Sequence, residues 1–580
     1  MKRLALLPLD ERPCNYRYPQ LLGPVAGVEV LLPPAQLMGY KKRPADADAL
    51  ANWLLEATEQ ADGLVVAAET LAFGGLIPSR VVDVTEEQAI ARLSVLQEIR
   101  RRHPTLPLFV QSVILRTPAY NSDDEEPTYW ATFGEHLYLY SVVLDALELG
   151  ETAWDRVRRS SLAFSSGLLA EALGKLRFDE LKARRAELEA EIPPDVREDW
   201  RWRRGRNHRI NREVVRHAAE GIVDFLSLTQ DDSPPLGLHA QEQRALTALI
   251  AERRTFRRVL MYPGADEAGL VLMARQVVQA AGLRPRVALR FSSTAGPQVV
   301  ARYEDRPLLE GIKSHLTALG GLYEPDFGAC DIALFVNSPD GPQEEAPRQH
   351  LPGSVGSGRS LPEFLEALAA ALASRPQRPV ALADVAYANG ADRALVEMLP
   401  AYVWPFDLAA YAGWNTAGNT IGSALAHAAL RWIGLSRLGR EEAARAERAH
   451  MGYLSLRFAE DWAYQAVVRQ ELAQGPVAVL GISPYALGAH RQALAADALA
   501  KLQSTFQRWQ ATWQPALAVR PEAAERALET LRWGGGEAKD RGEGASRGST
   551  GDGRVPRVRL TELDFPWDRL FEVALSVEVV

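Results

Sequence analysis

The sequence predicts an α/β fold in which short buried strands alternate with amphipathic helices over residues 1–434. Two observations support this fold class. Apolar runs of strand length recur along this part of the chain, and segments with helical periodicity, such as residues 86–102, separate them. Such alternation is typical of a parallel sheet covered by helices. About eight to ten strands fit either a (β/α)8-like barrel, which we favour, or doubly wound parallel sheets in two lobes with a cleft between them.

The predicted strands are apolar runs that end at charged or turn-forming residues. They cover residues 3–9, 28–32, 63–68, 106–115, 223–230, 258–262, 287–291, 331–336 and 380–383. Helical periodicity places helices at residues 46–61 and 86–102, and the second of these has its basic residues in the last turns. A loop of small and polar residues at 411–422 opens one more long helix.

The rest of the chain divides into segments of different composition. We expect an α/β domain of the catalytic type at residues 1–434, interrupted by a helical insertion at about 129–219. Residues 435–533 are predicted to be largely helical, with helices at 487–513 and 521–533 and one further strand at 476–482. Residues 534–554 are rich in glycine and polar residues, which predicts a flexible linker or loop, and residues 555–580 alternate like a short β tail.

Composition and charge exclude several classes of protein. The net charge is -8 and the pI is near 5.8, so no general electrostatic attraction to nucleic acid or to an anionic membrane is expected. Only Cys14 and Cys330 are present, far apart in sequence, which gives neither a disulfide framework nor a zinc motif. The first apolar run breaks at Pro8 and Asp10, too early for a signal peptide. A cytoplasmic protein is expected, and the oligomeric state stays open.

The most informative stretch is V-D-F-L-S-L-T-Q-D-D-S-P-P-L-G, residues 223–237. An apolar run of strand length ends there at Asp231 and Asp232, and proline and glycine follow at once. In parallel α/β sheets, ligands bind at the carboxyl ends of the strands. The repulsion between two adjacent carboxylates is unfavourable. Such a pair is therefore expected to share a proton, to bind a metal or to take part in catalysis. The alternative is a solvated turn that caps the next helix.

Many other predicted strands also end in polar side chains, which predicts one shared polar site. Turns favour Asp and Asn in any case, so a set of ordinary turn residues is the alternative. The candidate residues are Asp10, Arg12, Glu69, Arg80, Arg116, Asn121, Asp231, Asp232, Asp266, Glu267, Asn337, Asp384, Trp414 and Asn415.

The first functional hypothesis is hydrolysis of a small carbohydrate. Cleavage of a glycosidic bond usually needs one carboxyl group as proton donor and a second as base or nucleophile. The adjacent aspartates are similar to the pair used by some N-acetylhexosaminidases, in which one Asp orients the substrate's acetamide and the other protonates the leaving oxygen. Asp231 is then the orienting residue and Asp232 the general acid. Nine other candidates bind substrate, with Trp414 as an apolar face for a sugar ring: Asp10, Arg12, Glu69, Arg80, Arg116, Asn337, Asp384, Trp414 and Asn415.

Two further hypotheses stay open, and no cofactor is expected under the favoured one. In a metal-dependent hydrolase or lyase, Asp10, Asp231, Asp232, Asp266 and Glu267 supply oxygen ligands for Mg²⁺ or Mn²⁺. In a non-catalytic sugar or anion binder, Arg12, Arg80 and Arg116 hold a phosphate or carboxylate. A nucleotide enzyme or a serine hydrolase is disfavoured, because the sequence has no P-loop, no dinucleotide fingerprint and no Gly-x-Ser-x-Gly after a strand.

Several short motifs together resemble the bacterial domain of unknown function 4127 family. The likeness spans most of residues 1–434 and departs at Glu69, where the family has Asp. The motifs are P-L-D-E-R-P at Pro8–Pro13, T-L-A-F-G-G-L-I-P-S-R at Thr70–Arg80, Q-D-D-S at Gln230–Ser233 with G-L-H-A-Q-E at Gly237–Glu242, G-A-D-E at Gly264–Glu267, and G-W-N-T at Gly413–Thr416. The resemblance implies membership of the family and assigns no activity.

Overall fold

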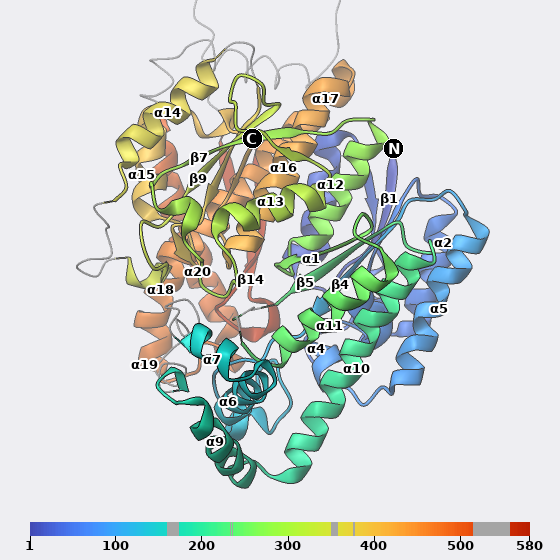
Figure 1. The fold of residues 1–580 in the computed structure, drawn as a ribbon. Helices are drawn as coiled ribbons and strands as arrows, with labels where there is room; N and C mark the ends of the chain where they lie inside the picture. Colours follow the sequence, from blue (N-terminus) through green and yellow to red (C-terminus); the bar gives the residue numbers. More distant parts are fainter. Residues whose placement is uncertain are drawn as a thin grey trace, which may run out of the picture.

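The computed structural model describes residues 1–158, 173–231, 234, 236–349, 358–374, 378–513 and 557–579. Two parallel sheets form its framework, and helices cover both (Figure 1). The first sheet has six strands in the order β2-β1-β3-β4-β5-β6. Their bounds are Arg3–Leu7 for β1, Glu29–Leu31 for β2, Leu64–Ala67 for β3, Leu108–Ile114 for β4, Phe225–Gln230 for β5 and Val259–Pro263 for β6.

The second sheet has five strands in the order β13-β11-β9-β7-β8. Counted along the chain, this order equals the order of the first five strands of the first sheet, so both lobes are wound alike. Both sheets are open and parallel, which is the doubly wound architecture; the favoured barrel is not confirmed. The bounds are Arg286–Phe291 for β7, Leu322–Tyr323 for β8, Ile332–Asn337 for β9, Val380–Asp384 for β11 and Ala410–Ala412 for β13.

Alternating side chains of the first sheet enter two different cores. Ala5 and Leu7 of β1 pack with helices α2 (Ala47–Thr58), α5 (Glu86–Arg102) and α10 (Pro194–Ala219), whereas Leu4 and Leu6 point to the opposite face. Helix α5 begins at a capping box in which Thr85 and Gln88 satisfy each other's backbone N–H groups. Within the described residues, no helix is long and apolar enough to cross a membrane.

One continuous apolar core joins the two lobes. It includes Leu4 and Leu6 of the first sheet and Leu334 of the second, together with helices α12 (Ala268–Ala280) and α16 (Ala417–Arg437). These two helices pack against each other. Because the core passes between the lobes, the carboxyl ends of both sheets are held at fixed positions on either side of one space.

The helical insertion has its own core, below the lobes in Figure 1. Its helices are α6 (Trp130–Leu149), α7 (Glu151–Arg158), α9 (Phe178–Glu191) and the first turns of α10. The tryptophans Trp130, Trp154 and Trp200 are buried in this core. Residues 159–172 of this insertion lie outside the described residues.

The C-terminal region begins with α17 (Arg440–Arg457), continues as a π-helix, η6 (Phe458–Val468), and passes into α18 (Arg469–Leu472). The strand predicted at 476–482 is wrong, because the chain there continues as helical turns, η7 (Ala473–Val477) and α19 (Ala478–Leu480). Helix α20 (Arg491–Ala511) agrees with the helix predicted at 487–513. The helix predicted at 521–533 and the linker at 534–554 lie outside the described residues.

The β tail forms an antiparallel hairpin of β14 (Val558–Asp564) and β15 (Ala574–Val579). Arg17 in α1 (Pro13–Leu22) donates a hydrogen bond to the carbonyl oxygen of Leu575, and Leu487 N–H donates to the carbonyl oxygen of Asp568. These contacts bring the connection between the two hairpin strands to the space between the lobes.

Candidate functional site

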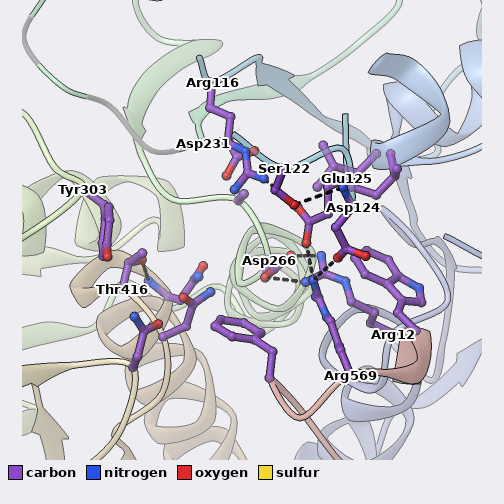
Figure 2. A pocket seen from close by; sticks show the side chains of 18 of the residues that line it. Arg12, Arg116, Ser122, Asp124, Glu125, Asp231, Asp266, Tyr303, Thr416 and Arg569 are labelled. Atoms are coloured by element: carbon purple, nitrogen blue, oxygen red, sulfur yellow. Dashed lines mark hydrogen bonds and ion pairs between the residues drawn. The ribbon is translucent and has the colours of Figure 1, made fainter. Parts of the chain in front are cut away.

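A cavity of about 650 Å³ lies where the carboxyl ends of both sheets converge. One side, the first wall, contains Arg12, Arg80, Arg116, Asp124, Glu125, Asp231 and Asp266. The other side, the second wall, contains Tyr303, Glu304, Asn389, Asn415, Thr416, Asn419 and Arg469. The hairpin connection supplies Trp567, Arg569 and Phe571. Figure 2 shows Tyr303 and Thr416 across the cavity from Arg12, Asp124 and Arg569.

Arg12 holds two carboxylates in the first wall. Its Nη2 lies 2.7 Å from Asp10 Oδ2 and 2.5 Å from Asp266 Oδ1, and the side chain of Asn15 donates to both carboxylates. Burial raises the pKa of Asp266 to about 6, although Arg12 opposes the shift. The ring of Trp567 stacks on Arg12, with 4.6 Å from the guanidinium carbon to the ring centroid.

Arg80 fixes Asp231 at the end of β5. Arg80 Nη2 donates to Asp231 Oδ2 over 2.6 Å, and Arg80 Nη1 lies 2.9 Å from Glu126 Oε1. Asp231 therefore lines the cavity, as expected for a residue at a strand end. Its predicted partner, Asp232, lies outside the described residues.

Glu125 is surrounded by three guanidinium groups. Arg116 Nη2 lies 2.7 Å and Arg80 Nη1 3.2 Å from its carboxylate, and Arg569 also forms an ion pair with it. Although burial opposes the shift, Arg569, Arg116 and Arg80 hold the pKa of Glu125 well below its usual range. The hairpin is thus tied to the first wall through Arg569.

Glu304 is the buried carboxyl group of the second wall, with only 7% of its surface exposed. It lies at the N-terminus of α16, where the backbone N–H of Gly418 donates to its carboxylate. Burial raises the pKa of Glu304 to about 7, against the opposing effects of His315 and of the Gly418 N–H. Near Glu304, His315 Nε2 lies 3.0 Å from Glu267 Oε1. Burial lowers the pKa of His315, but the contact with Glu267 outweighs it, so the pKa is raised.

Strained backbone conformations cluster at the cavity. In the described residues, seven non-glycine residues have positive φ, and four of them line this cavity: Tyr303 at 69°, Asn389 at 60°, Asn415 at 61° and Trp567 at 57°. Tyrosine and tryptophan rarely adopt this conformation, which costs on the order of 1–3 kcal/mol. Such strain persists where the surrounding structure enforces it and is concentrated at functional sites.

Several polar groups of the second wall have no partner. In the part of the chain that the structure describes, the side chains of Asn389 and Asn415 make no hydrogen bond, and the buried Oδ1 of Asn419 is also unsatisfied. Arg469 Nη1 donates to Gln465 Oε1 over 2.8 Å, but no described carboxylate lies within ion-pair distance of Arg469. These groups are available to a ligand.

Three predicted site residues in the first lobe, Asp10, Glu69 and Glu267, do not line the cavity, and Glu267 is instead buried against His315. Asp10 reaches the cavity only through Arg12. Glu69 receives hydrogen bonds from Ser112 Oγ, 2.9 Å away, and from Val113 N–H, 2.8 Å away. Burial raises the pKa of Glu69 to about 7, but the residue does not line the cavity.

The structure also places three predicted residues of the second lobe outside the cavity lining. Asn337 donates to Asp384 Oδ1 over 2.8 Å, in a buried network that also contains Asp392 and Arg359. Trp414 is buried, so its ring is covered by protein and does not line the cavity. The cavity lining does include Arg12, Arg80, Arg116, Asn121, Asp231, Asp266 and Asn415.

The cavity also includes residues that the sequence reasoning missed, above all Glu304 and Arg469 and the segment from Trp567 to Phe571. The tail sequence F-P-W-D-R-L-F, residues 565–571, combines aromatic and charged residues between two alternating runs, which is a signal that could have been noticed. Nothing in the sequence indicates that Trp567 meets Arg12, 555 positions earlier, because such a contact depends on the packing of the whole chain.

The four described carboxylates among the proposed metal ligands are each held by an arginine or histidine side chain. Arg12 pairs with Asp10 and Asp266, Arg80 pairs with Asp231, and His315 contacts Glu267. Within the described ranges, no group of three or more His, Cys, Asp or Glu residues has a metal-binding arrangement.

Comparison with known proteins gives one match. The family model described as "Protein of unknown function (DUF4127)" matches residues 4–163 and 151–576, which together span nearly the whole chain and include β14 and the start of β15. No curated protein matches the sequence, and no solved structure matches it.

Proposed function

Because this chain belongs to the DUF4127 family, which carries no assigned activity, we propose its function from the cavity: hydrolysis of a small carbohydrate, with Glu304 as the proton donor. The observation that carries the proposal is a buried carboxyl group with a raised pKa that faces the same cavity as Asp231, a carboxylate held by Arg80. Two carboxyl groups in different environments are the requirement for acid/base cleavage of a glycosidic bond.

Glu304 replaces Asp232 as the candidate acid. A general acid works best when its pKa is close to the working pH, and a group with a pKa of about 7 is half protonated at neutral pH. The protonated carboxyl donates its proton to the leaving oxygen as the glycosidic bond breaks. Glu304 sits on a rigid support, since α16 and the pair of His315 and Glu267 fix its surroundings.

Asp231 is the second carboxyl group of the proposed mechanism. Arg80 holds it at the end of β5 through the 2.6 Å contact. In that position the carboxylate acts as the base toward water or as the nucleophile at the anomeric carbon. The stereochemistry of the product, followed by proton NMR, distinguishes these two roles.

The remaining lining suits a sugar. Phe571 and Tyr303 offer aromatic surfaces to the apolar faces of a sugar ring, and Asn389 and Asn415 offer amides to its hydroxyl groups. A cavity of about 650 Å³ accommodates a small ligand. Cys14 and Cys330 are both buried and free, and we expect a cytoplasmic location, which cell fractionation tests.

The test is turnover of a panel of 4-nitrophenyl glycosides by wild type, Glu304→Gln, Asp231→Asn and a matched control, Glu69→Gln. Glu69 is also a buried glutamate with a pKa of about 7, but it lies outside the cavity lining. We expect the first two variants to lose about 100- to 10,000-fold in kcat and the control to keep its rate. Full activity in Glu304→Gln contradicts the proposal. Loss of wild-type activity in a chelator favours the divalent-metal-dependent hydrolase or lyase.

A non-catalytic sugar or anion binder is the second candidate. The unpartnered amides and Arg469 of the second wall favour it, because they equip the cavity for binding whether or not a bond is broken. Binding of a sugar without turnover, in wild type and Glu304→Gln alike, is the result that selects this alternative.

A further inference from the structure

Arg469 differs from the other four arginines of the cavity. Arg12, Arg80, Arg116 and Arg569 each form ion pairs with one or more carboxylates. Arg469 forms none with any described residue. The three arginines expected from the sequence to hold an anion are therefore already neutralised, and the free positive charge of the cavity is at Arg469.

The position of Arg469 is set by an unusual element. It follows directly on the π-helix η6, an 11-residue stretch of a conformation that is rare and often marks functional sites. Gln465 of η6 accepts one hydrogen bond from Arg469, and the ring of Phe571 lies 4.9 Å from the guanidinium carbon. The ring covers one face of the guanidinium group and leaves its remaining N–H groups available to the cavity.

The surroundings of Arg469 do not compensate its charge. Burial lowers the pKa of Arg469. The negative charge of Glu345, which lines the same cavity, raises this pKa but lies beyond ion-pair distance. The carboxylate of Glu345 also accepts a hydrogen bond from Tyr303, 2.8 Å away. A partly buried cation without a counter-ion is unfavourable, and a bound anion removes that cost.

Uncharged donors lie beside this cation. The backbone of Gly390 packs against Gln465, the residue that holds Arg469, and an added Cβ at Gly390 would lie 3.3 Å from Gln465 Cβ. This contact places the adjacent Asn389 next to the π-helix. The N–H of Asn389 donates to the carbonyl oxygen of Asn415, so the two strained asparagines are joined with their side-chain amides unused.

We propose that the carbohydrate bound in this cavity is acidic, and that Arg469 binds its carboxylate or phosphate group while Asn389 and Asn415 bind neighbouring oxygens. This inference rests on the proposed function and names its substrate class. A planar guanidinium group that binds two oxygens at once is the usual partner of both kinds of anion.

Binding measurements on the whole protein test the proposal. Calorimetry compares D-glucuronate, D-galacturonate and D-glucose 6-phosphate with D-glucose and D-galactose, and thermal unfolding compares inorganic phosphate with chloride at equal ionic strength. The proteins are wild type, Arg469→Gln, Arg469→Lys and the control Arg101→Gln, which removes an equal charge from an exposed surface helix.

We expect phosphate and at least one sugar acid to bind wild type and the control. Arg469→Gln should weaken this binding by about 10- to 100-fold, and Arg469→Lys by less. The KM for a 4-nitrophenyl glycoside of the acidic sugar should rise with little change in kcat. Equal responses of wild type and Arg469→Gln to phosphate, no response of wild type to any anion, or preferential binding of neutral sugars each overturn the proposal.

The same data separate this inference from the proposed function. Arg469-dependent binding of acidic sugars without turnover rejects the hydrolase and keeps the anion site. Hydrolysis of neutral glycosides that needs Glu304 but is unchanged in Arg469→Gln keeps the hydrolase and rejects the anion site.

Discussion

The first wall of the cavity pairs its charges with one another, and the second wall does not. Arg12 and Arg80 hold carboxylates of their own wall, whereas Asn389 and Arg469 face the cavity without such partners. Both walls are built on the carboxyl ends of parallel sheets that share the order of five strands. The difference indicates a division of labour, in which the first wall stabilises the cavity and the second wall binds the ligand.

The largest effect on stability is expected at Arg12. The variant Arg12→Met leaves the buried carboxylates of Asp10 and Asp266 without their counter-ion, which should lower the free energy of unfolding by about 3–5 kcal/mol. Arg3→Met, which removes an exposed ion pair with Glu29, is the control and should change it by at most about 1 kcal/mol. Urea unfolding measures both. If Arg12→Met lowers the unfolding free energy as little as Arg3→Met does, the first wall does not stabilise the protein.

A second prediction concerns the pH dependence of stability at Glu69. Its pKa is raised from 4.5 to about 7 in the folded protein, so its contribution to stability is fully present below pH 4.5 and is lost as the pH rises through about 7. The loss amounts to about 3 kcal/mol. In Glu69→Gln, the fall in unfolding free energy between these pH values should be smaller by that amount. An unchanged pH profile would show that Glu69 titrates normally.

Trp567 joins the hairpin to the first wall, and its removal should have an intermediate effect. The ring is buried between Arg12 and Arg569, so Trp567→Leu is expected to cost about 2 kcal/mol. Trp202 also stacks on arginines but is 42% exposed, and Trp202→Leu should cost less than half as much. Thermal unfolding of the two variants gives the comparison; equal losses would contradict a special role for the hairpin.

The smallest effect on stability is expected at Arg469. Because this residue forms no ion pair with the described residues, Arg469→Gln should change the unfolding free energy by about 0.5 kcal/mol or less. A decrease of more than about 2 kcal/mol in the free energy of unfolding, measured with urea, would show that Arg469 stabilises the fold as Arg12 does. The two walls would then not differ in this respect.

The sequence predicted the parallel α/β class and most strands, because buried strands such as β4 are continuous apolar runs between clear turns. It could not decide between a barrel and two open sheets, since strand order is set by packing between distant segments. The strand β13 is only three residues long, which is too short to distinguish from the polar loop predicted at 411–422.

The sequence predicts part of the candidate site, namely residues that follow strands. Arg12 and Asp231 were found because they follow strands, and the carboxyl ends of parallel strands share one edge. Arg80 reaches the same edge from the helix Leu76–Val81. Glu304 and Arg469 were missed because neither directly follows a strand: Glu304 lies in the connection to the next helix, and Arg469 follows a π-helix with no signal in the sequence pattern.

The most direct test of Glu304 as the general acid is the pH dependence of kcat/KM for the best substrate of the glycoside panel. If Glu304 is the general acid, the rate must fall as the pH rises through about 7, because the proton donor is lost. We expect this fall in wild type and in Glu69→Gln, and its absence from the residual activity of Glu304→Gln. A fall near pH 7 that persists in Glu304→Gln would exclude Glu304 as the general acid.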